Sequence, residues 1–282
     1  MPSREEIIEY IRSSLLTKYP NKIMQIYGIG SFFFSSFPVK TPIDVVVLLS
    51  DTTDVPRKDY TTALFEDTEW QGCKLRYMYA TISTYLHRNE FEQSSFSNYV
   101  WSIRAMKHQS ELLYGQDIRD RLPELHYTPA DYEKICLNAM YHLEGSVTRY
   151  NQPDPQRLWK GLIKTAFFLS VVEEPDSNYH SVESLLVKMR EYADQSIIQT
   201  DFINILTDAY QKRLNNTFPT NLTEYVAYRK QCVRMILKEI PRHVNGMDWE
   251  RLRSLLLRGF TDSRNGFVGL VMIGDELYQR RY

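Results

Sequence analysis

Two glycines and a serine near the start of the sequence are spaced as in a phosphate-binding turn. Gly28, Gly30 and Ser31 stand at the end of the β-rich run Ile23–Ile29. A glycine turn lets backbone N–H groups approach phosphate oxygens closely, and the hydroxyl of Ser31 can donate one more hydrogen bond. A plain strand-end turn is the alternative, and it is the commoner role of paired glycines. The segment predicts a phosphate site whose binding residues are Gly30 and Ser31.

One carboxylate lies at the start of the next apolar run. Asp44 belongs to Ile43–Leu49, and Mg²⁺ prefers hard oxygen ligands of this kind. Residues i and i+2 of a strand face the same way, so an Asp-x-Asp pair would present two ligands together. Pro42 occupies the first of those positions. Asp44 is the candidate catalytic residue and metal ligand, although one carboxylate is a poor site for two metal ions. A cap of the turn after Pro42 is the alternative role of Asp44. The spacing gives no preference among the other acids that could complete the site, which are Asp51, Asp54, Glu66, Asp67 and Glu69.

The strand, the Gly-Ser turn and the acid of the next strand resemble the start of the polymerase-β-like nucleotidyltransferase superfamily. The resemblance implies that Gly30 and Ser31 hold the phosphates of an NTP and that Asp44 holds Mg²⁺. The superfamily also places a third acid on a later strand, where this sequence offers Lys74 and Arg76. The acidic motif of this chain is therefore degenerate with respect to the superfamily.

A second segment carries the same resemblance. Glu111–Ile118 is similar to the strand and turn that close the nucleotidyltransferase domain in the minimal and aminoglycoside-type enzymes of the superfamily. In the two-domain enzymes of this kind a helical bundle follows. The resemblance thus implies a nucleotide-binding domain with a helical domain after it.

The elements expected in the first half fit that arrangement. Ser3 and Glu6 form a capping-box pattern, and the apolar spacing behind them predicts a helix over residues 4–18. Further predicted elements are strands over Ile23–Ile29, Ile43–Leu49 and Cys73–Ile82, a helix or turn over Val55–Glu66, a helix over Phe91–Gln109 and a short strand from Glu111. This order predicts an α/β (α+β) nucleotidyltransferase-like domain with a mixed sheet, over residues 1–122.

The second half is predicted to be helical from Thr128, which is followed by a proline at the first position of the helix. We expect an all-α helical bundle domain over residues 123–282. Its predicted helices are Tyr132–Tyr150, a helix from Asp154 to about Val172, Ser181–Ala193, Asp201–Leu214, Leu222–Ile240 and Trp249–Leu257. The short apolar piece Gly266–Ile273 is interpreted as a strand or a buried extended tail.

Three cations share one face of a predicted helix in this second half. Arg157, Lys160 and Lys164 follow an i, i+3, i+7 spacing. Lys160 and Lys164 are the candidate residues for contact with the triphosphate, or with the phosphates of RNA. A solvated helix face is the alternative interpretation.

Composition limits the class of protein. The formal net charge of −1 provides no general attraction to nucleic acid or to an anionic membrane. Three cysteines lie far apart, so we expect reduced, buried thiols. The first residues do not form a signal peptide, and the apolar stretches are too short to span a bilayer. We expect a cytosolic protein without membrane contact.

Three functional hypotheses follow. The first is transfer of an NMP from an NTP to a small molecule, RNA or a protein, with Mg²⁺ as the metal. The second is a catalytically inactive nucleotidyltransferase-fold protein that serves as a binding module for nucleotide, nucleic acid or a protein. The third is an assembly role, in which the aromatic segment Phe32–Phe37 contacts a protein partner or a second copy of the chain.

Overall fold

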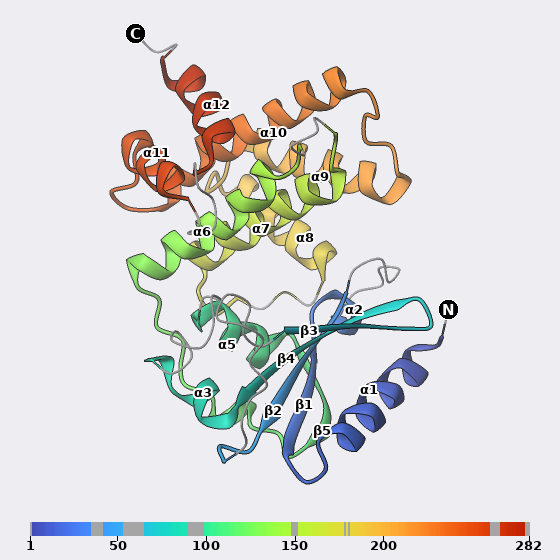
Figure 1. The fold of residues 1–282 in the computed structure, drawn as a ribbon. Helices are drawn as coiled ribbons and strands as arrows, with labels where there is room; N and C mark the ends of the chain where they lie inside the picture. Colours follow the sequence, from blue (N-terminus) through green and yellow to red (C-terminus); the bar gives the residue numbers. More distant parts are fainter. Residues whose placement is uncertain are drawn as a thin grey trace. The chain divides into compact units, whose positions relative to one another are not determined.

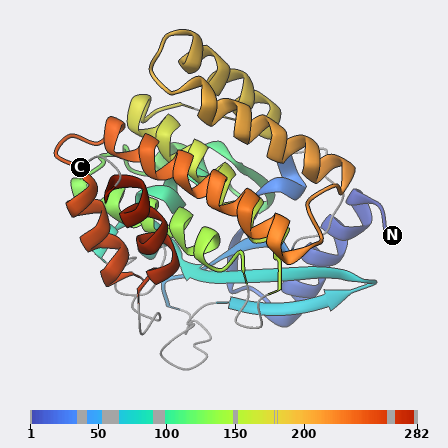
Figure 2. The same ribbon diagram turned by 90° about the horizontal axis from the view of Figure 1, so that it is seen from above.

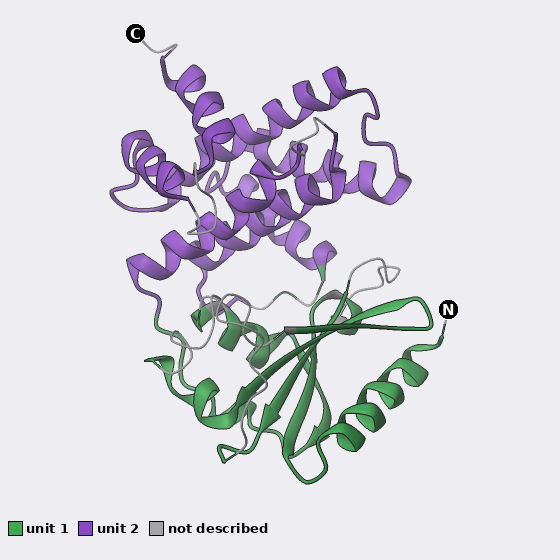
Figure 3. Ribbon diagram, viewed as in Figure 1, with its two compact units in different colours: residues 1–126, 178–181 green, residues 127–177, 182–282 purple. Residues whose placement is uncertain are grey.

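The chain forms two compact units in a computed structural model. One unit comprises residues 1–126 and 178–181, and the other comprises residues 127–177 and 182–282 (Figure 3). The expected division into domains of residues 1–122 and 123–282 stays a prediction. The residues that the structure describes are 2–34, 42–52, 65–89, 99–147, 152–177, 179, 181–259 and 266–279.

The first unit is built on a five-stranded sheet of order β3-β4-β2-β1-β5 (Figure 1). The strands are β1 (Ile23–Ile29), β2 (Ile43–Leu49), β3 (Phe65–Trp70), β4 (Cys73–Thr81) and β5 (Ser110–Gly115). The pairing of β2 with β4 is parallel, whereas β1 pairs antiparallel with β2 and β5, and β3 antiparallel with β4. The expected mixed sheet is therefore confirmed.

Helix α1 (Arg4–Lys18) covers one face of this sheet. It begins as expected, because the Ser3 side chain accepts a hydrogen bond from the Glu6 backbone and Glu6 returns one to Ser3. Every fourth residue of its inner face is buried, namely Ile7, Ile11 and Leu15. These side chains pack with the apolar side chains that β2 and β4 direct to the same side. Burial of this stripe holds the helix to the sheet.

Helix α5 (Tyr99–His108) packs against β1 and β5, and the short helix α3 (Ile82–Leu86) follows β4. The central strand β2 is nearly all buried as a result, which explains its continuous apolar sequence. The expected helix over Phe91–Gln109 is confirmed from Tyr99 to His108, and residues 90–98 lie outside the described part of the chain.

The edge strand β3 was not expected from the sequence. Residues 55–64 of the helix or turn expected over Val55–Glu66 lie outside the described ranges, and its last two residues belong to β3, so the prediction is wrong there. A two-residue turn joins β3 to β4, and its residues Gln71 and Gly72 have φ angles of 47° and 77°. Two left-handed residues in succession suit the tight hairpin turn that matches strand twist.

The second unit is helical, as expected. Its helices are α6 (Pro129–Glu144), α7 (Pro155–Glu173), α8 (Val182–Asp194), α9 (Thr200–Asn215), α10 (Leu222–His243), α11 (Trp249–Arg258) and α12 (Val268–Gln279). The long helix α10, orange in Figure 2, packs against α7, α9 and α12. Helix α6 ends at Glu144 rather than at Tyr150.

The strand or extended tail expected over Gly266–Ile273 is wrong, because residues 268–279 form helix α12. Leu270 and Val271 are buried on its inner side, and the ring of Trp249 lies against the backbone of Gly274. A short apolar run fits a buried strand and a buried helix equally well by its pattern alone.

Two expectations from composition can be compared with the structure. Cys73, Cys136 and Cys232 are buried and unbridged, as expected. Within the described ranges, no helix combines the length and the apolar character that a membrane crossing requires.

Candidate functional site

The turn after β1 contains the first candidate residues. Gly30 has a φ angle of +83°, which an L side chain rarely adopts, so glycine is required here. Helix α2 (Ser31–Phe34) follows directly, and the Phe33 N–H donates to the Gly30 carbonyl over 3.1 Å. Ser31 is thus the first residue of α2, although its side chain lies outside the described part of the structure.

Gly28 has a different role from Gly30. It belongs to β1, and a Cβ atom built on it would lie 2.0 Å from Cζ of Phe33. The ring therefore packs directly on the strand, which requires a residue without a side chain. Phe33 is 8% exposed, so the expectation that it belongs to an exposed contact surface is wrong. Phe37 lies outside the described residues.

Asp44 lies beside the Gly30 turn. It is the second residue of β2, and its pairing partner on β1 is Ile29. A Cβ atom built on Gly30 would lie 3.8 Å from Asp44 Oδ2. The structure therefore brings together Gly30 and Asp44, which the sequence had proposed as the phosphate turn and the acid.

A charged row runs across the sheet from Asp44. Arg76 of β4 is the in-register neighbour of Asp44, and Asp67 of β3 is the in-register neighbour of Arg76. In-register side chains of neighbouring strands share one face. The Arg76 Nε–H donates to Asp67 Oδ1 over 2.8 Å. This hydrogen bond raises the pKa of Arg76, and the charges of Asp44 and Asp67 raise it further.

These residues do not fit the Mg²⁺ site that the superfamily implies. Pro42 and Arg76 stand at the two places where further carboxylates were expected, and neither can act as a ligand of a metal cation. Across the ranges that the structure describes, no group of three or more His, Cys, Asp or Glu side chains is placed to hold a metal. The metal role of Asp44 stays a prediction.

Among the described acids considered from the sequence, Glu66, Asp51 and Glu69 have neighbours other than Asp44. Glu66 accepts two hydrogen bonds from the ammonium group of Lys18 on α1, at 2.7 and 2.6 Å, and lies on the opposite face of the sheet from Asp67. Asp51 accepts a hydrogen bond from the Ser83 backbone over 3.0 Å. Glu69 pairs in register with Lys74, and Asp54 lies outside the described ranges.

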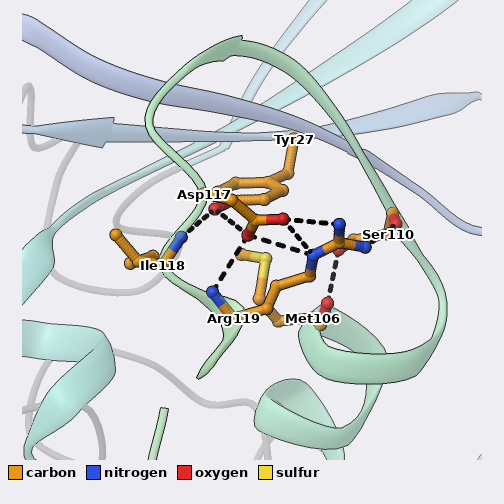
Figure 4. Close-up of polar contacts among 6 residues, drawn as sticks. All are labelled: Tyr27, Met106, Ser110, Asp117, Ile118 and Arg119. Carbon is orange, nitrogen blue, oxygen red and sulfur yellow. Dashed lines mark hydrogen bonds and ion pairs between the residues drawn. The ribbon is translucent and has the colours of Figure 1, made fainter. Parts of the chain in front are cut away.

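A polar cluster joins β1 to the segment that follows β5 (Figure 4). Tyr27 of β1 donates through its hydroxyl to Asp117 Oδ1 over 3.1 Å and accepts from the Ile118 N–H over 2.9 Å. The guanidinium of Arg119 donates to both oxygens of Asp117 and, over 3.1 Å, to the Ser110 carbonyl. The Arg119 contact lowers the pKa of Asp117 to about 2, and burial raises the pKa of Tyr27 to about 12.

This cluster gives a structural role to the segment that resembles the closing turn of the superfamily. Gly115 ends β5 with a φ angle of +89°, and a Cβ atom there would lie 2.0 Å from the Met24 carbonyl oxygen. No role was predicted from the sequence for Tyr27, Asp117 or Arg119. The signal that could have indicated the ion pair is an acid two residues before an arginine, close behind Gly115.

The candidate cations of the second half gather beside α6. The Lys164 ammonium donates to the Asn138 side chain, and Lys160 lies one turn away on α7. The pKa of His142 is lowered to about 3, first by burial and then by the charges of Lys164, Lys160 and Arg157. Because these residues belong to the second unit, a contact with phosphates bound at Gly30 stays a prediction.

Replacing Asp117 by Asn is expected to lower the free energy of unfolding by about 1 kcal/mol at pH 7. A fall of the pKa from 3.8 to about 2 corresponds to roughly 2 kcal/mol, and we reduce this figure because the side chain is 40% exposed. The folded state has the lower pKa, so the contribution is present above about pH 4 and disappears as the pH falls through about 2.

Urea denaturation between pH 7 and pH 2 measures this difference, with Asp120→Asn as the neighbouring control. An equal effect of both substitutions at pH 7, or a difference that does not shrink in acid, would contradict the assignment.

No protein-family model matches the sequence, and no curated protein matches it either. The structure is similar to the crystal structure of spectinomycin adenyltransferase AAD(9) from Enterococcus faecialis, solved with ATP and spectinomycin. The TM-score is 0.52 and the identity 10%, over 83% of this chain and 99% of that chain.

A nucleotidyltransferase-like protein from Exiguobacterium sibiricum 255-15 matches with a TM-score of 0.30 and 9% identity, over 97% of this chain and 90% of that chain. Nothing is inferred from a likeness this weak. The match to AAD(9) concerns the fold alone, and it covers both the mixed sheet and the helical region after it. The chain has the polymerase-β-like nucleotidyltransferase fold.

Proposed function

We propose that this chain is a nucleotide-binding module of the nucleotidyltransferase fold, which binds a nucleoside triphosphate at the end of the sheet where Gly30 follows β1 and Asp44 begins β2. The observation that carries the proposal is the left-handed Gly30 turn, placed 3.8 Å from Asp44 Oδ2 when measured from a Cβ built on the glycine. The similarly folded AAD(9) was solved with ATP, which supports this choice of ligand.

The roles in such a site follow from the residue types. Without a side chain, Gly30 lets phosphate oxygens approach the backbone N–H groups of the turn. Ser31 is proposed to add one hydrogen bond from its hydroxyl. Lys160 and Lys164 are proposed to supply positive charge toward the phosphates, since ammonium groups act as point charges for phosphate.

A second candidate function is transfer of an NMP to an acceptor on a small molecule, RNA or a protein. The likeness of the fold to an adenyltransferase favours it. That chemistry requires Mg²⁺, with Asp44 as its expected ligand, and the described acids do not assemble such a site around Asp44. Because one fold hosts many activities, binding without transfer is placed first. A protein partner or a second copy of the chain stays a prediction.

Replacing Gly30 by Ala is expected to weaken ATP binding at least about tenfold, because the new methyl group strains the turn and blocks the phosphates. Isothermal titration calorimetry measures the affinity. Gly72→Ala is the matched control, since Gly72 also has a positive φ angle and has open space around it. The proposal fails if wild-type protein does not bind ATP at millimolar concentration, or if Gly30→Ala binds ATP as tightly as the wild type.

We expect no NMP transfer above the level of the Asp44→Asn variant. The protein would be incubated with ATP, Mg²⁺ and pools of hydroxylated small molecules, RNA or proteins, and mass spectrometry would detect an added AMP. If the wild type transfers AMP and the Asp44→Asn variant does not, the binding proposal is wrong and the second candidate function, NMP transfer, is supported.

Replacing both Lys160 and Lys164 by Ala is expected to weaken ATP binding by about tenfold at low salt, and by less at high salt, where charges are screened. The matched control is the double variant Lys188→Ala/Lys212→Ala, whose ammonium groups already pair with Glu174 and Asp208. Equal ATP affinity of the two double variants would remove the two lysines from the proposed site.

A further inference from the structure

The residue beside Asp44 on the sheet has the opposite charge from the one that a metal site requires. Parallel pairing sets Arg76 of β4 in register with Asp44 of β2. Neighbouring strands lie about 4.8 Å apart, so side chains at paired positions are close neighbours on the same face. A carboxylate at position 76 would complete an acidic pair with Asp44, and the chain has a guanidinium there instead.

Arg76 also has a second carboxylate on its other side. Its Nε–H donates to Asp67 Oδ1 over 2.8 Å, from the antiparallel neighbour β3. A guanidinium stays charged at every relevant pH. The row Asp44–Arg76–Asp67 therefore contains its own cation, and a divalent ion approaching Asp44 meets a fixed positive charge on the adjacent strand.

The position of the arginine allows it to reach a bound solute. The Arg76 side chain is 39% exposed and that of Asp67 is 66% exposed. An exposed ion pair of this kind is weak in water, so a phosphate can compete for the guanidinium. Arginine binds phosphate through parallel N–H donors, which makes it a strong phosphate ligand.

We propose that Arg76 takes the place of the divalent cation beside Asp44, so that the site binds a nucleoside triphosphate without a metal ion. The nucleotide part rests on the proposed function above. The metal part, that Asp44 holds no divalent ion while Arg76 is present, rests on the sheet register alone. The charges of Asp44 and Asp67 keep the guanidinium in place until a phosphate arrives.

The metal part is tested on nucleotide-free protein with Mn²⁺, whose bound fraction is read by electron paramagnetic resonance. Wild type and Arg76→Gln are expected to show no site at millimolar Mn²⁺, because Gln adds no charged ligand. Arg76→Asp is expected to gain one Mn²⁺ site, because the new carboxylate forms an acidic pair with Asp44. The double variant Arg76→Asp/Asp44→Asn is expected to lose that site.

A wild-type Mn²⁺ site that Asp44→Asn abolishes would overturn the proposal, and so would a folded Arg76→Asp variant without Mn²⁺ binding. Circular dichroism reports folding. If Arg76→Asp does not fold, the double variant Arg76→Asp/Asp67→Asn takes its place, because it has one acid fewer in the row.

The nucleotide part is tested by ATP titration with EDTA and with Mg²⁺. The affinity of the wild type for ATP is expected to be the same within about twofold with EDTA and with Mg²⁺. Arg76→Gln is expected to weaken ATP binding about tenfold under both conditions. Lys74→Gln is the matched control, from the same strand and face. Binding that needs Mg²⁺, or an Arg76→Gln variant equal to wild type, would overturn this part. No ATP binding under either condition would overturn the proposed function, while the Mn²⁺ measurement still decides the metal part.

Discussion

The hydrogen bonding of β2 to both of its neighbours is the constraint on which the first unit depends. One side of β2 pairs antiparallel with β1, which sets Asp44 opposite Ile29 and next to the Gly30 turn. The other side pairs parallel with β4, which sets Asp44 beside Arg76. A shift of either pairing by one residue would turn each side chain of a strand to the other face. Because the face of β2 opposite Asp44 packs in the apolar core, such a shift would turn the Asp44 carboxylate into that core.

The same sheet therefore positions the turn that we propose binds phosphate and the charge pattern that we propose excludes a metal ion. The position of Gly30 follows from backbone geometry, whereas the charge beside Asp44 comes from one side chain on β4, that of Arg76. Asp44 and Asp67 lie on either side of Arg76, on the two strands that pair with β4. Their charges set the electrostatics of the row, whereas backbone hydrogen bonds set the path of the strands. This separation explains how a chain can have the nucleotidyltransferase fold while the charges beside Asp44 differ from those that the superfamily implies.

Contacts at the ends of elements complete both units. In the first, Tyr27 and Arg119 hold the segment after β5 against the sheet through Asp117. In the second, the carboxylate of Glu144 on α6 accepts hydrogen bonds from the Gly269 and Leu270 N–H groups, at 2.9 and 3.1 Å. The first turn of a helix has N–H groups without partners in the helix, so this carboxylate stabilises the start of α12.

Local patterns in the sequence were sufficient for α1, β1, β2 and the general order of sheet and helices. The capping residues of α1 lie within the helix they begin, and a strand buried on both faces has a recognisable apolar run. The fold and the closeness of Gly30 to Asp44 could be predicted because the first strand, its Gly-Ser turn and the acid of the next strand together resemble the superfamily.

Only the tertiary structure decided β3, α12 and the partner of Asp44. Strand β3 is a charged edge strand without an apolar pattern, and it is stabilised by pairing with β4. Helix α12 depends on Glu144, which is 125 residues away from Gly269. The charge beside Asp44 depends on which residue of a distant strand pairs with it. Interactions between residues far apart in the chain leave no periodic pattern in the sequence. For this reason only the structure shows which residue lies beside Asp44.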